Sequence, residues 1–453
     1  MLLDEKVREY VHANQGRFVQ DISRLVAQPS VSARNEGLQE CSRLVAEMIR
    51  EIGGTSRILG LEGAPPLVYG EVRSDRSEKT ILFYNHYDVQ PEAPLDLWLS
   101  PPFKPEVREG RLYGRGVSDD KGELVARLKL VESYVRLHGE PPCNIKFCFE
   151  GEEEVGSGHL PGYVSGNPGL FESDAINWED GMITRDGTPL VSLGAKGMMY
   201  LELACRSLSH DAHSKYAAAL PSASWRLTRL LETIKDGNER ILIDGWYDDV
   251  KELTPEELQM LRDEPSEVGR LPEIYGSSGF AAGMSRFEAT VALTALPTAN
   301  IAGIWAGYEG AGSKTVLPAE ARCKIDLRLV PDQEPDVLFQ RFLDHLGKHG
   351  CSDVEVTKMT MEPAARTSYR SGWAQAALKA ASTVFGTRPA IELSSAGTGP
   401  FFVFTRRYDV PIISIGVSPS DAGAHSPNES LRLDYLEKGM LWMGETIEEF
   451  LAA

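Results

Sequence analysis

The sequence predicts an α/β fold: a mixed, mostly parallel sheet forms one domain, and a smaller α+β sandwich is inserted into it. Short apolar runs alternate with helical segments over the first 195 residues, and the pattern changes between residues 196 and 363. The chain has 453 residues, more than one hydrophobic core usually supports. We therefore expect a first domain built from residues 1–195 and 364–453, with residues 196–363 inserted between its two parts.

Helical apolar spacing marks four segments of the expected first domain: residues 5–27, 38–52, 123–137 and 434–451. Pro29 ends the first pattern, and Gly53-Gly54 ends the second, because these residue types interrupt helices. The last segment has an apolar face and is expected to pack back on the sheet.

Four short apolar segments are typical of strands buried on both faces of a parallel sheet: residues 80–84, 144–149, 174–178 and 410–417. Open sheets of this kind place functional sites beyond the carboxyl ends of their strands. Imidazole or carboxylate side chains follow these segments: His86, Glu153, Glu154, Asp180 and His425. Their placement predicts one shared site at this edge of the sheet.

The middle of the chain has the pattern of a separate domain. Strands are expected at 199–206, 300–308 and 321–329, and helices around 227–234 and 335–345. A passage rich in Asp, Glu and Gly occupies residues 236–286. This order of strands and helices predicts a small α+β sandwich.

The composition excludes one class of partner and favours one compartment. The net charge is -19 and the pI is near 5.0, whereas nucleic-acid-binding surfaces need a basic stripe. No apolar run approaches the roughly 20 residues of a membrane span, so we expect no membrane contact. Charged residues at positions 4–6 leave no signal-peptide core. The six cysteines form no CxxC pair, as expected of reduced thiols in a cytoplasmic protein.

Two motifs bring metal-binding groups together. His86 and Asp88 lie two residues apart, so that His86 can bind a metal while Asp88 accepts the other ring N–H. Asp119 and Asp120 follow the glycine-rich residues 114–116, which lack the order of a phosphate loop. Two adjacent carboxylates suit a cation. Asp119 is a candidate bridge between two metals, and either aspartate also suits a helix N-cap.

The acidic run Glu150–Glu154 directly follows an apolar strand. Carboxylates at the end of a buried strand cost free energy unless a counter-charge neutralises them. Glu153 and Glu154 suit two roles, in which one binds metal and its neighbour stays free as the general base for a metal-held water. Together, these segments predict a two-metal hydrolase centre.

These motifs, in this order and spacing, resemble the M20 metallopeptidase family, and within it the carnosine-type dipeptidase branch. The likeness covers nearly the whole chain and rests on residues 84–91, 114–122, 153–157 and 425–429. The long polar insert in the lid and residues 312–318, followed by residues 328–331, favour the dipeptidase branch, and residues 211–214 resemble the lid histidine motif.

The resemblance implies two divalent metal ions, with zinc the expected metal and manganese or cobalt as replacements. The implied ligands are His86, Asp119 and Asp180 for one ion, and Asp119, Glu154 and His425 for the other. Asp88 is implied to hold the metal ligand His86 in place without binding the metal itself, and Glu153 is implied to act as base and proton shuttle. The bond between Asp119 and Asp120 is often cis in this family.

The inserted domain is implied to be the family's lid, through which a homodimer forms. His213 and Thr315 are expected to reach the partner's active site, where His213 donates to the developing oxyanion. Arg328 is expected to clamp the terminal carboxylate of a small peptide substrate. Ser395 stands where carnosine-type dipeptidases carry a glutamate thought to hold the substrate's amine. Backbone N–H groups around Gly397 suit a carboxylate.

The sequence thus predicts an enzyme that hydrolyses the amide bond of small peptides, and a dipeptidase in particular. A metal-bridging water would lose its proton to Glu153, which would return it to the leaving amine. One alternative is an N-acyl-amino-acid deacylase on the same scaffold, which Ser395 favours. The other is a non-catalytic binding or scaffold protein, which predicts damaged metal ligands.

Overall fold

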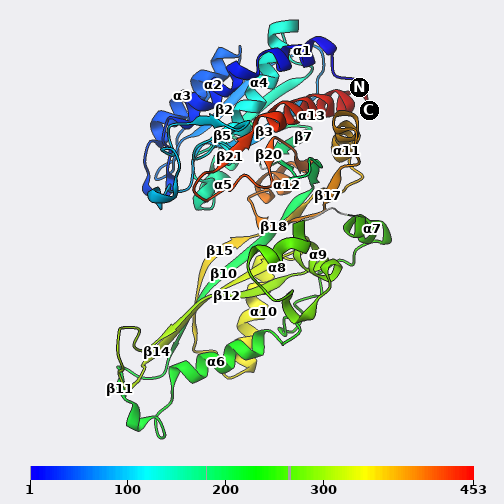
Figure 1. The fold of residues 1–453 in the computed structure, drawn as a ribbon. Coiled ribbons are helices and arrows are strands. Elements are labelled where there is room, and N and C mark those ends of the chain that lie inside the picture. The colour runs from blue at the N-terminus through cyan, green and yellow to red at the C-terminus, as the bar shows by residue number, and fades with distance from the viewer. Residues whose placement is uncertain (1, 180, 264–266) are drawn as a thin grey trace. The chain divides into compact units, whose positions relative to one another are not determined.

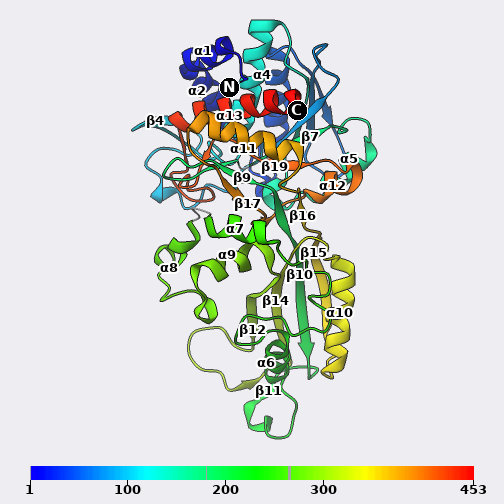
Figure 2. The ribbon, with the colours of Figure 1, turned by 90° about the vertical axis from the view of Figure 1, so that its right-hand side faces the viewer.

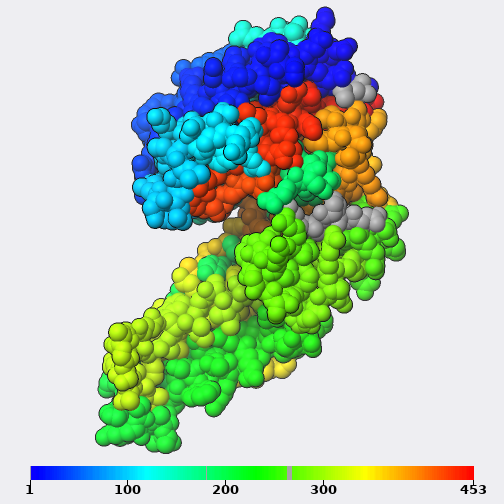
Figure 3. Space-filling view, in the orientation of Figure 1, coloured from blue at the N-terminus to red at the C-terminus, as the bar shows by residue number. Residues whose placement is uncertain are grey.

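The computed structural model describes every residue except 1, 180 and 264–266, and the chain divides into two compact units (Figure 1). Unit 1 comprises Met1–Gly194, Thr367–Leu393 and Pro400–Ala453, and unit 2 comprises Ala195–Arg366 and Ser394–Gly399. In the space-filling view, unit 1 combines the blue and cyan N-terminal residues with the orange and red C-terminal ones, whereas unit 2 is mainly green and yellow (Figure 3). The middle of the chain therefore folds apart from its two ends.

An eight-stranded mixed sheet forms the centre of unit 1. Its order is β1 (Thr55–Leu59), β2 (Leu67–Val72), β6 (Asn144–Glu150), β3 (Thr80–His86), β7 (Ala175–Trp178), β19 (Ile412–Ser414), β9 (Leu190–Ser192) and β17 (Ala390–Glu392). The four strands expected from their apolar runs are the adjacent β6, β3, β7 and β19, and all of them are parallel. Antiparallel pairs join β1 to β2 and β2 to β6. The predicted mixed, mostly parallel sheet is confirmed.

Helices cover this sheet: α1 (Glu5–Ala13), α2 (Gln15–Val26), α3 (Leu38–Glu51), α4 (Lys121–His138), α5 (Leu160–Gly166), α11 (Gly372–Phe385), α12 (Phe402–Tyr408) and α13 (Leu433–Ala452). The helical spacing of residues 5–27 belongs to two helices that meet at Asn14. Every residue of α4 from 121 to 134 is buried, because α1, α2 and α13 pack against it. Its N-terminus, where Asp119 and Asp120 lie, is therefore held from several sides.

Unit 2 is the predicted α+β sandwich. Its antiparallel sheet has the order β12 (Thr298–Ala306), β14 (Glu320–Leu329), β10 (Gly194–Arg206) and β15 (Glu355–Glu362). Buried and part-exposed residues alternate along β14, and its buried side chains share a core with α6 (Ala223–Ile234) and α10 (Pro335–Lys348). Figure 2 shows α10 running alongside β10 and β15. Short strands β16 (Ala365–Arg366) and β18 (Ser395–Thr398) also pair with β10.

The polar passage through residues 236–286 contains helices that its composition does not indicate. They are α7 (Pro255–Asp263) and α8 (Leu271–Ile274), and α9 (Arg286–Ala295) follows them. A capping box formed by Ser285 and Glu288 begins α9. At another edge of unit 2, β11 (Ala212–His213) pairs with β13 (Val316–Leu317).

Three short pairings hold the loops beyond the unit 1 sheet. Strand β20 (Ser418–Pro419) lies parallel to β8 (Met182–Ile183). Strand β21 (Ser430–Arg432) pairs with β5 (Arg111–Tyr113), which pairs in turn with β4 (Glu106–Arg108). The loops after β5 and before β21 are therefore neighbours. None of the helices within the described part of the chain has the length and apolar character to cross a membrane.

Candidate metal centre

Asp119 lies between two histidines from distant parts of the chain. Its Oδ1 is 3.0 Å from Nε2 of His86, at the end of β3, and its Oδ2 is 3.0 Å from Nε2 of His425, in the loop after β20. Nε2 of His425 is also 3.1 Å from Oε2 of Glu154, in the turn that follows β6. The structure thus brings together four side chains that the sequence singles out, separated by up to 339 residues.

Asp88 orients both His86 and the acidic turn. Nδ1 of His86 is 3.0 Å from the main-chain carbonyl oxygen of Asp88 and 3.3 Å from its carboxylate Oδ1. The Asp88 carboxylate accepts hydrogen bonds from the amides of Glu153 (3.2 Å) and Glu154 (3.1 Å). The carbonyl oxygen is therefore the nearer acceptor for the ring N–H, and the carboxylate mainly fixes the turn that carries the two glutamates.

Gln90 holds Glu154 in place. Its amide Nε2 donates to Oε2 of Glu154 (2.9 Å), and its main-chain N–H donates to Oε1 (3.1 Å). The side chain of Glu154 is 3 % exposed. A buried carboxylate with fixed orientation is the arrangement expected of a metal ligand.

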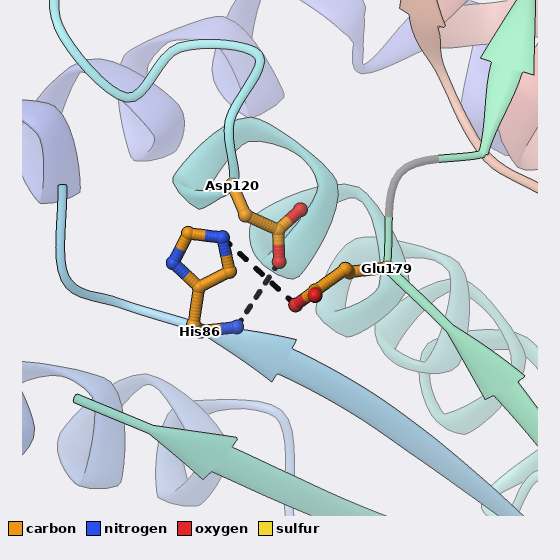
Figure 4. Close-up of side chains that lie close together, drawn as sticks. All are labelled: His86, Asp120 and Glu179. Carbon is orange, nitrogen blue, oxygen red and sulfur yellow. Dashed lines mark hydrogen bonds and ion pairs between the residues drawn. The ribbon is translucent and has the colours of Figure 1, made fainter. Parts of the chain in front are cut away.

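Two further acids, Asp120 and Glu179, also lie close to His86 (Figure 4). Oδ2 of Asp120 accepts hydrogen bonds from the main-chain N–H of His86 (3.1 Å) and from Nδ2 of Asn85 (2.7 Å). Oε2 of Glu179, directly after β7, is 3.9 Å from Nε2 of His86. The peptide bond between Asp119 and Asp120 is cis. Asp180, the remaining predicted ligand, lies outside the described residues.

The donor set fits divalent metal ions. Ligand atoms of His86, Asp119 and Glu154 all lie within 4.8 Å of one another, and so do those of His86, Asp120 and Glu179. Imidazole nitrogens with carboxylate oxygens are the ligands of zinc, and they also suit manganese and cobalt. The two groups share His86, so the described side chains surround one compact volume rather than two separate sites.

The ionisation of these groups shows that the centre favours positive charge. Burial disfavours the charged form of His86, but the nearby carboxylates, led by that of Glu179, outweigh burial and raise its pKa well above its usual range. Hydrogen bonds to Asp119 and Glu154 raise the pKa of His425 to about 10. Burial opposes ionisation of Asp119, yet both histidines lower its pKa. Bound cations supply the same positive charge.

Glu153 is placed differently from its neighbour Glu154. Within the described residues, its carboxylate makes no hydrogen bond, while its main-chain N–H is held by Asp88. Burial raises the pKa of Glu153 well above its usual range, although the nearby imidazole of His86 lowers it. A carboxyl group with a raised pKa and no fixed partner has the properties of a general base that works near neutral pH.

Glu150, at the end of β6, is a buried acid that gives a prediction about stability. Tyr84 and Ser157 donate hydrogen bonds to its Oε1, and burial raises its pKa to about 8. In the unfolded chain the pKa is near 4.3. Between these two values the folded protein holds a proton that the unfolded chain has lost, so the contribution of Glu150 to stability is complete at low pH and decreases as the pH rises.

We expect Glu150→Gln to remove this pH dependence. The unfolding free energy of the variant, measured by urea denaturation, should gain on the order of a few kcal/mol relative to the unmodified protein between pH 5 and pH 9. Parallel stability curves for the two proteins across that range would contradict the assignment.

His213 and Thr315, both exposed, lie next to each other in unit 2. The amide of Ser214 donates to the carbonyl oxygen of Thr315 (3.3 Å), and His213 pairs with Val316 across β11 and β13. Nδ1 of His213 accepts a hydrogen bond from the amide of Lys215 (3.1 Å), which leaves Nε2 as the ring's donor. Their expected reach into a partner's active site stays a prediction.

Arg328 and the glycine-rich segment also come together. Nη1 of Arg328, on β14, donates to Oγ1 of Thr398 at 2.5 Å, and Thr398 ends β18, which begins at Ser395. The Ser395 hydroxyl accepts a hydrogen bond from the amide of Gly397 (3.2 Å), so it stabilises the turn in which it lies. The side chain of Arg328 is 30 % exposed, and its Nε lies 3.7 Å from Oδ1 of Asp326. The guanidinium is therefore oriented by Thr398 and Asp326, while the side chain as a whole remains partly accessible.

Sequence reasoning gave no role to Glu179, Gln90 and Thr398. Glu179 occupies the same strand-end position that singled out Asp180, so position alone could have identified it. Gln90 lies in the motif 84–91, and its role depends on contact with Glu154, 64 residues away. Thr398 falls in the segment of Ser395 and Gly397, but its partner Arg328 lies 70 residues away. Spacing along the chain does not reveal such contacts.

Known proteins resemble this chain along nearly its whole length. The profile described as Peptidase family M20/M25/M40 matches residues 82–449. The Cys-Gly metallodipeptidase dug1 of Schizosaccharomyces pombe is 28% identical, covering 96% of this chain and 96% of its own. The Beta-Ala-His dipeptidase of Homo sapiens is 29% identical and covers 98% of this chain and 92% of its own.

Solved structures share the fold. The M20 family metallo-carboxypeptidase Sso-CP2 from Sulfolobus solfataricus has a TM-score of 0.90 and 33% identity, covering 96% of this chain and 99% of that one. Human carnosine dipeptidase 1 has a TM-score of 0.80 and 27% identity, covering 99% of this chain and 98% of that one.

Proposed function

Because the chain belongs to peptidase family M20/M25/M40, and is therefore a metallopeptidase, we propose that it is a dinuclear, metal-dependent dipeptidase. The observation that carries this proposal is the placement of Asp119 between His86 and His425, with one carboxylate oxygen 3.0 Å from each ring. The curated relatives named for dipeptidase activity support the substrate class.

We assign the ligands as the family likeness implies. His86, Asp119 and Asp180 would hold one ion, and Asp119, Glu154 and His425 would hold the other. Zinc is the metal we propose, with manganese or cobalt as replacements. Gln90 and Asp88 orient these ligands through the hydrogen bonds described above.

Divalent cations held by these residues would polarise the scissile carbonyl and make an attacking water more acidic. Glu153 accepts the proton of that water and returns it to the leaving amine. His213, donating through Nε2, stabilises the developing oxyanion. Arg328, with Thr398 fixing one end of its guanidinium, binds the substrate's terminal carboxylate, and Ser395 and Gly397 shape the adjoining turn.

We expect Arg328→Met to lower kcat/KM by roughly 100-fold for peptides with a free terminal carboxylate, because a charge-assisted pair is lost. Peptides that end in a carboxamide should show little change. Arg322→Met is the matched control, since Arg322 lies on the same strand and pairs with Glu202 and Glu320. Equal losses on both substrate types would remove Arg328 from this role.

A second candidate is a carboxypeptidase that removes the last residue of longer peptides. The structural relative Sso-CP2, named as a metallo-carboxypeptidase, is 33% identical and favours it. Ser395, which stands where carnosine-type dipeptidases carry a glutamate thought to hold the substrate's amine, agrees with carboxypeptidase activity. The curated dipeptidase relatives give no support to the N-acyl-amino-acid deacylase alternative.

Rates on a dipeptide, an N-acetylated amino acid and a tripeptide with the same C-terminal residue separate these functions. A dipeptidase hydrolyses only the free dipeptide rapidly, a carboxypeptidase also cleaves the tripeptide, and a deacylase releases acetate or another acyl group from an N-acylated amino acid. No hydrolysis of any of them by protein loaded with zinc, manganese or cobalt would refute the proposal.

We propose that two copies associate through unit 2. Strand β12 is an edge strand, and Ile301, Ile304 and Trp305 on it are exposed. Ile301 and Ile304 pair with Ile325 and Cys323, which belong to the buried core. Ile301 and Ile304 therefore lie on the same side of the sheet as the buried core, but on an edge strand where they are exposed. Exposed apolar side chains on an edge strand are expected of an interface.

We expect Ile304→Glu to convert a dimer into a monomer of 49.9 kDa in sedimentation experiments. Ile58→Glu is the control, since Ile58 is exposed on β1, the edge strand of the other unit. A protein that is already monomeric without substitution would refute the interface.

The cysteines support a reducing compartment. All six are free and buried. Because structural disulfides are typical of oxidising compartments, we propose that the enzyme acts in the cytoplasm.

A further inference from the structure

The residues after His425 connect its loop to two other loops of unit 1. Oδ1 of Asn428 accepts a hydrogen bond from the amide of Leu99 (2.8 Å), and its Nδ2 donates to the carbonyl oxygen of Leu97 (2.8 Å). Glu429, the next residue, is fully buried and contacts the segment 114–119 instead. The loop is thus anchored at its end by two consecutive side chains.

The carboxylate of Glu429 accepts four hydrogen bonds from this segment. Oε1 accepts from the amides of Ser118 (2.9 Å) and Asp119 (3.0 Å). Oε2 accepts from the amide of Gly116 (2.9 Å) and from Nη1 of Arg115 (2.7 Å). Consecutive amides that surround an anion form a nest, so residues 115–119 are folded around this side chain.

Two ligand-bearing loops therefore meet at one carboxylate. Glu429 binds the main-chain N–H of Asp119, and the side chain of Asp119 contacts both His86 and His425. His425 lies four residues before Glu429, and its side chain is 58% exposed, so burial does little to fix it. The loop of His425 therefore contacts Asp119 twice: His425 contacts its carboxylate, and the buried Glu429 binds its main-chain N–H.

We propose that Glu429 is a positioning residue of the metal centre, and that it sets the affinity for the ion shared by Asp119, Glu154 and His425. This inference rests on the two-metal function proposed above. Partners that orient metal ligands typically change metal affinity 10- to 100-fold when replaced. A change of that size is therefore expected when the carboxylate of Glu429 is lost, with a smaller change for the ion on the His86 side.

Glu429→Gln tests this inference. Glutamine keeps the size of the side chain, but its amide nitrogen donates where the carboxylate accepted, so it cannot satisfy all four donors. Metal dissociation constants are measured by competition with a chelator, and the melting temperature of the metal-free protein is measured separately. Glu445→Gln is the matched control, because Glu445 is a buried carboxylate on α13 that accepts the amides of Leu2 and Leu3.

The expected result is that Glu429→Gln weakens the binding of one ion 10- to 100-fold, whereas Glu445→Gln lowers the melting temperature and leaves metal affinity unchanged. Arg115→Lys, which disturbs one of the four donors, should weaken binding by a smaller factor and replaces Glu429→Gln if that variant does not fold. Wild-type affinity for both ions in the folded variant tested would overturn the inference. If the unsubstituted protein binds no metal, the proposed function fails instead.

Discussion

Replacing Glu153 by glutamine is expected to reduce turnover by a factor of 10² to 10⁴ without loss of metal. The amide is too weak a base to accept the proton of the attacking water, and its N–H protons are not acidic enough to be given to the leaving amine. Metal binding should persist, because the groups around the centre are held by Asp88 and Gln90 rather than by the side chain of Glu153. Steady-state rates and metal content per chain, measured on the same sample, test both halves of this expectation.

The neighbouring Glu152 provides a matched control. It belongs to the same acidic run and is also buried, but its carboxylate accepts a hydrogen bond from the amide of His159 and contacts that ring. Glu152→Gln should keep turnover within a few-fold of the unmodified enzyme. If Glu153→Gln also stays within tenfold, another group must move the proton, and the role of Glu153 is wrong.

Asp119→Asn is expected to abolish activity by a different route, through loss of both metal ions. Each carboxylate oxygen of Asp119 is 3.0 Å from a different histidine, so both ions depend on it if it bridges them. The asparagine side chain is neutral and offers only one acceptor oxygen. After dialysis, the variant should contain less than one ion per chain, and its rate should fall by at least 10³.

Asp434→Asn is a suitable control for this variant, since Asp434 pairs with Arg432 at the start of α13. Circular dichroism of both variants reports whether the fold is kept. An Asp119→Asn protein that retains two tightly bound ions would show that Asp119 does not bridge. The combined result matters more than either one: Glu153→Gln should lose chemistry and keep metal, and Asp119→Asn should lose both.

The central strands were predictable because they are buried on both faces. Strands β3, β7 and β19 contain short, largely apolar runs, and in β6 only Lys146 interrupts the apolar residues 145–149. This signal needs no knowledge of distant contacts. Strand β19 is shorter than expected, since beyond residue 414 side chains replace the strand ladder. The amide of Ile415 donates to Oδ1 of Asn177 (3.1 Å), and that of Val417 donates to Oε1 of Glu123 (2.8 Å).

Other elements carry too little periodic signal to be identified. Strands β9 and β17 have three residues each, and β1 is largely exposed. The buried face of α11 consists mainly of alanines, including Ala376, Ala377 and Ala380, which contrast weakly with the polar face. Its amphipathic pattern is therefore faint although its helix propensity is high.

The candidate site was predictable as a set of residues and much less so as a set of contacts. Strand-end position and motif spacing single out His86, Asp119, Glu154 and His425, which the structure brings within hydrogen-bonding distance. The contact between Glu429 and Arg115 joins residues 314 apart, and nothing in local spacing encodes it. Long-range contacts of this kind arise from how the loops fold around each other.

The two halves of the proposed chemistry reside in different compact units. The described ligand candidates and Glu153 belong to unit 1, whereas Arg328 and Thr398 belong to unit 2, each held within its own hydrogen-bond network. Substitutions around Arg328 and Thr398 that change the proposed carboxylate recognition can therefore accumulate in unit 2 while the metal ligands and Glu153 in unit 1 stay unchanged. This division would let related proteins evolve different substrate preferences without any change in the candidate metal centre.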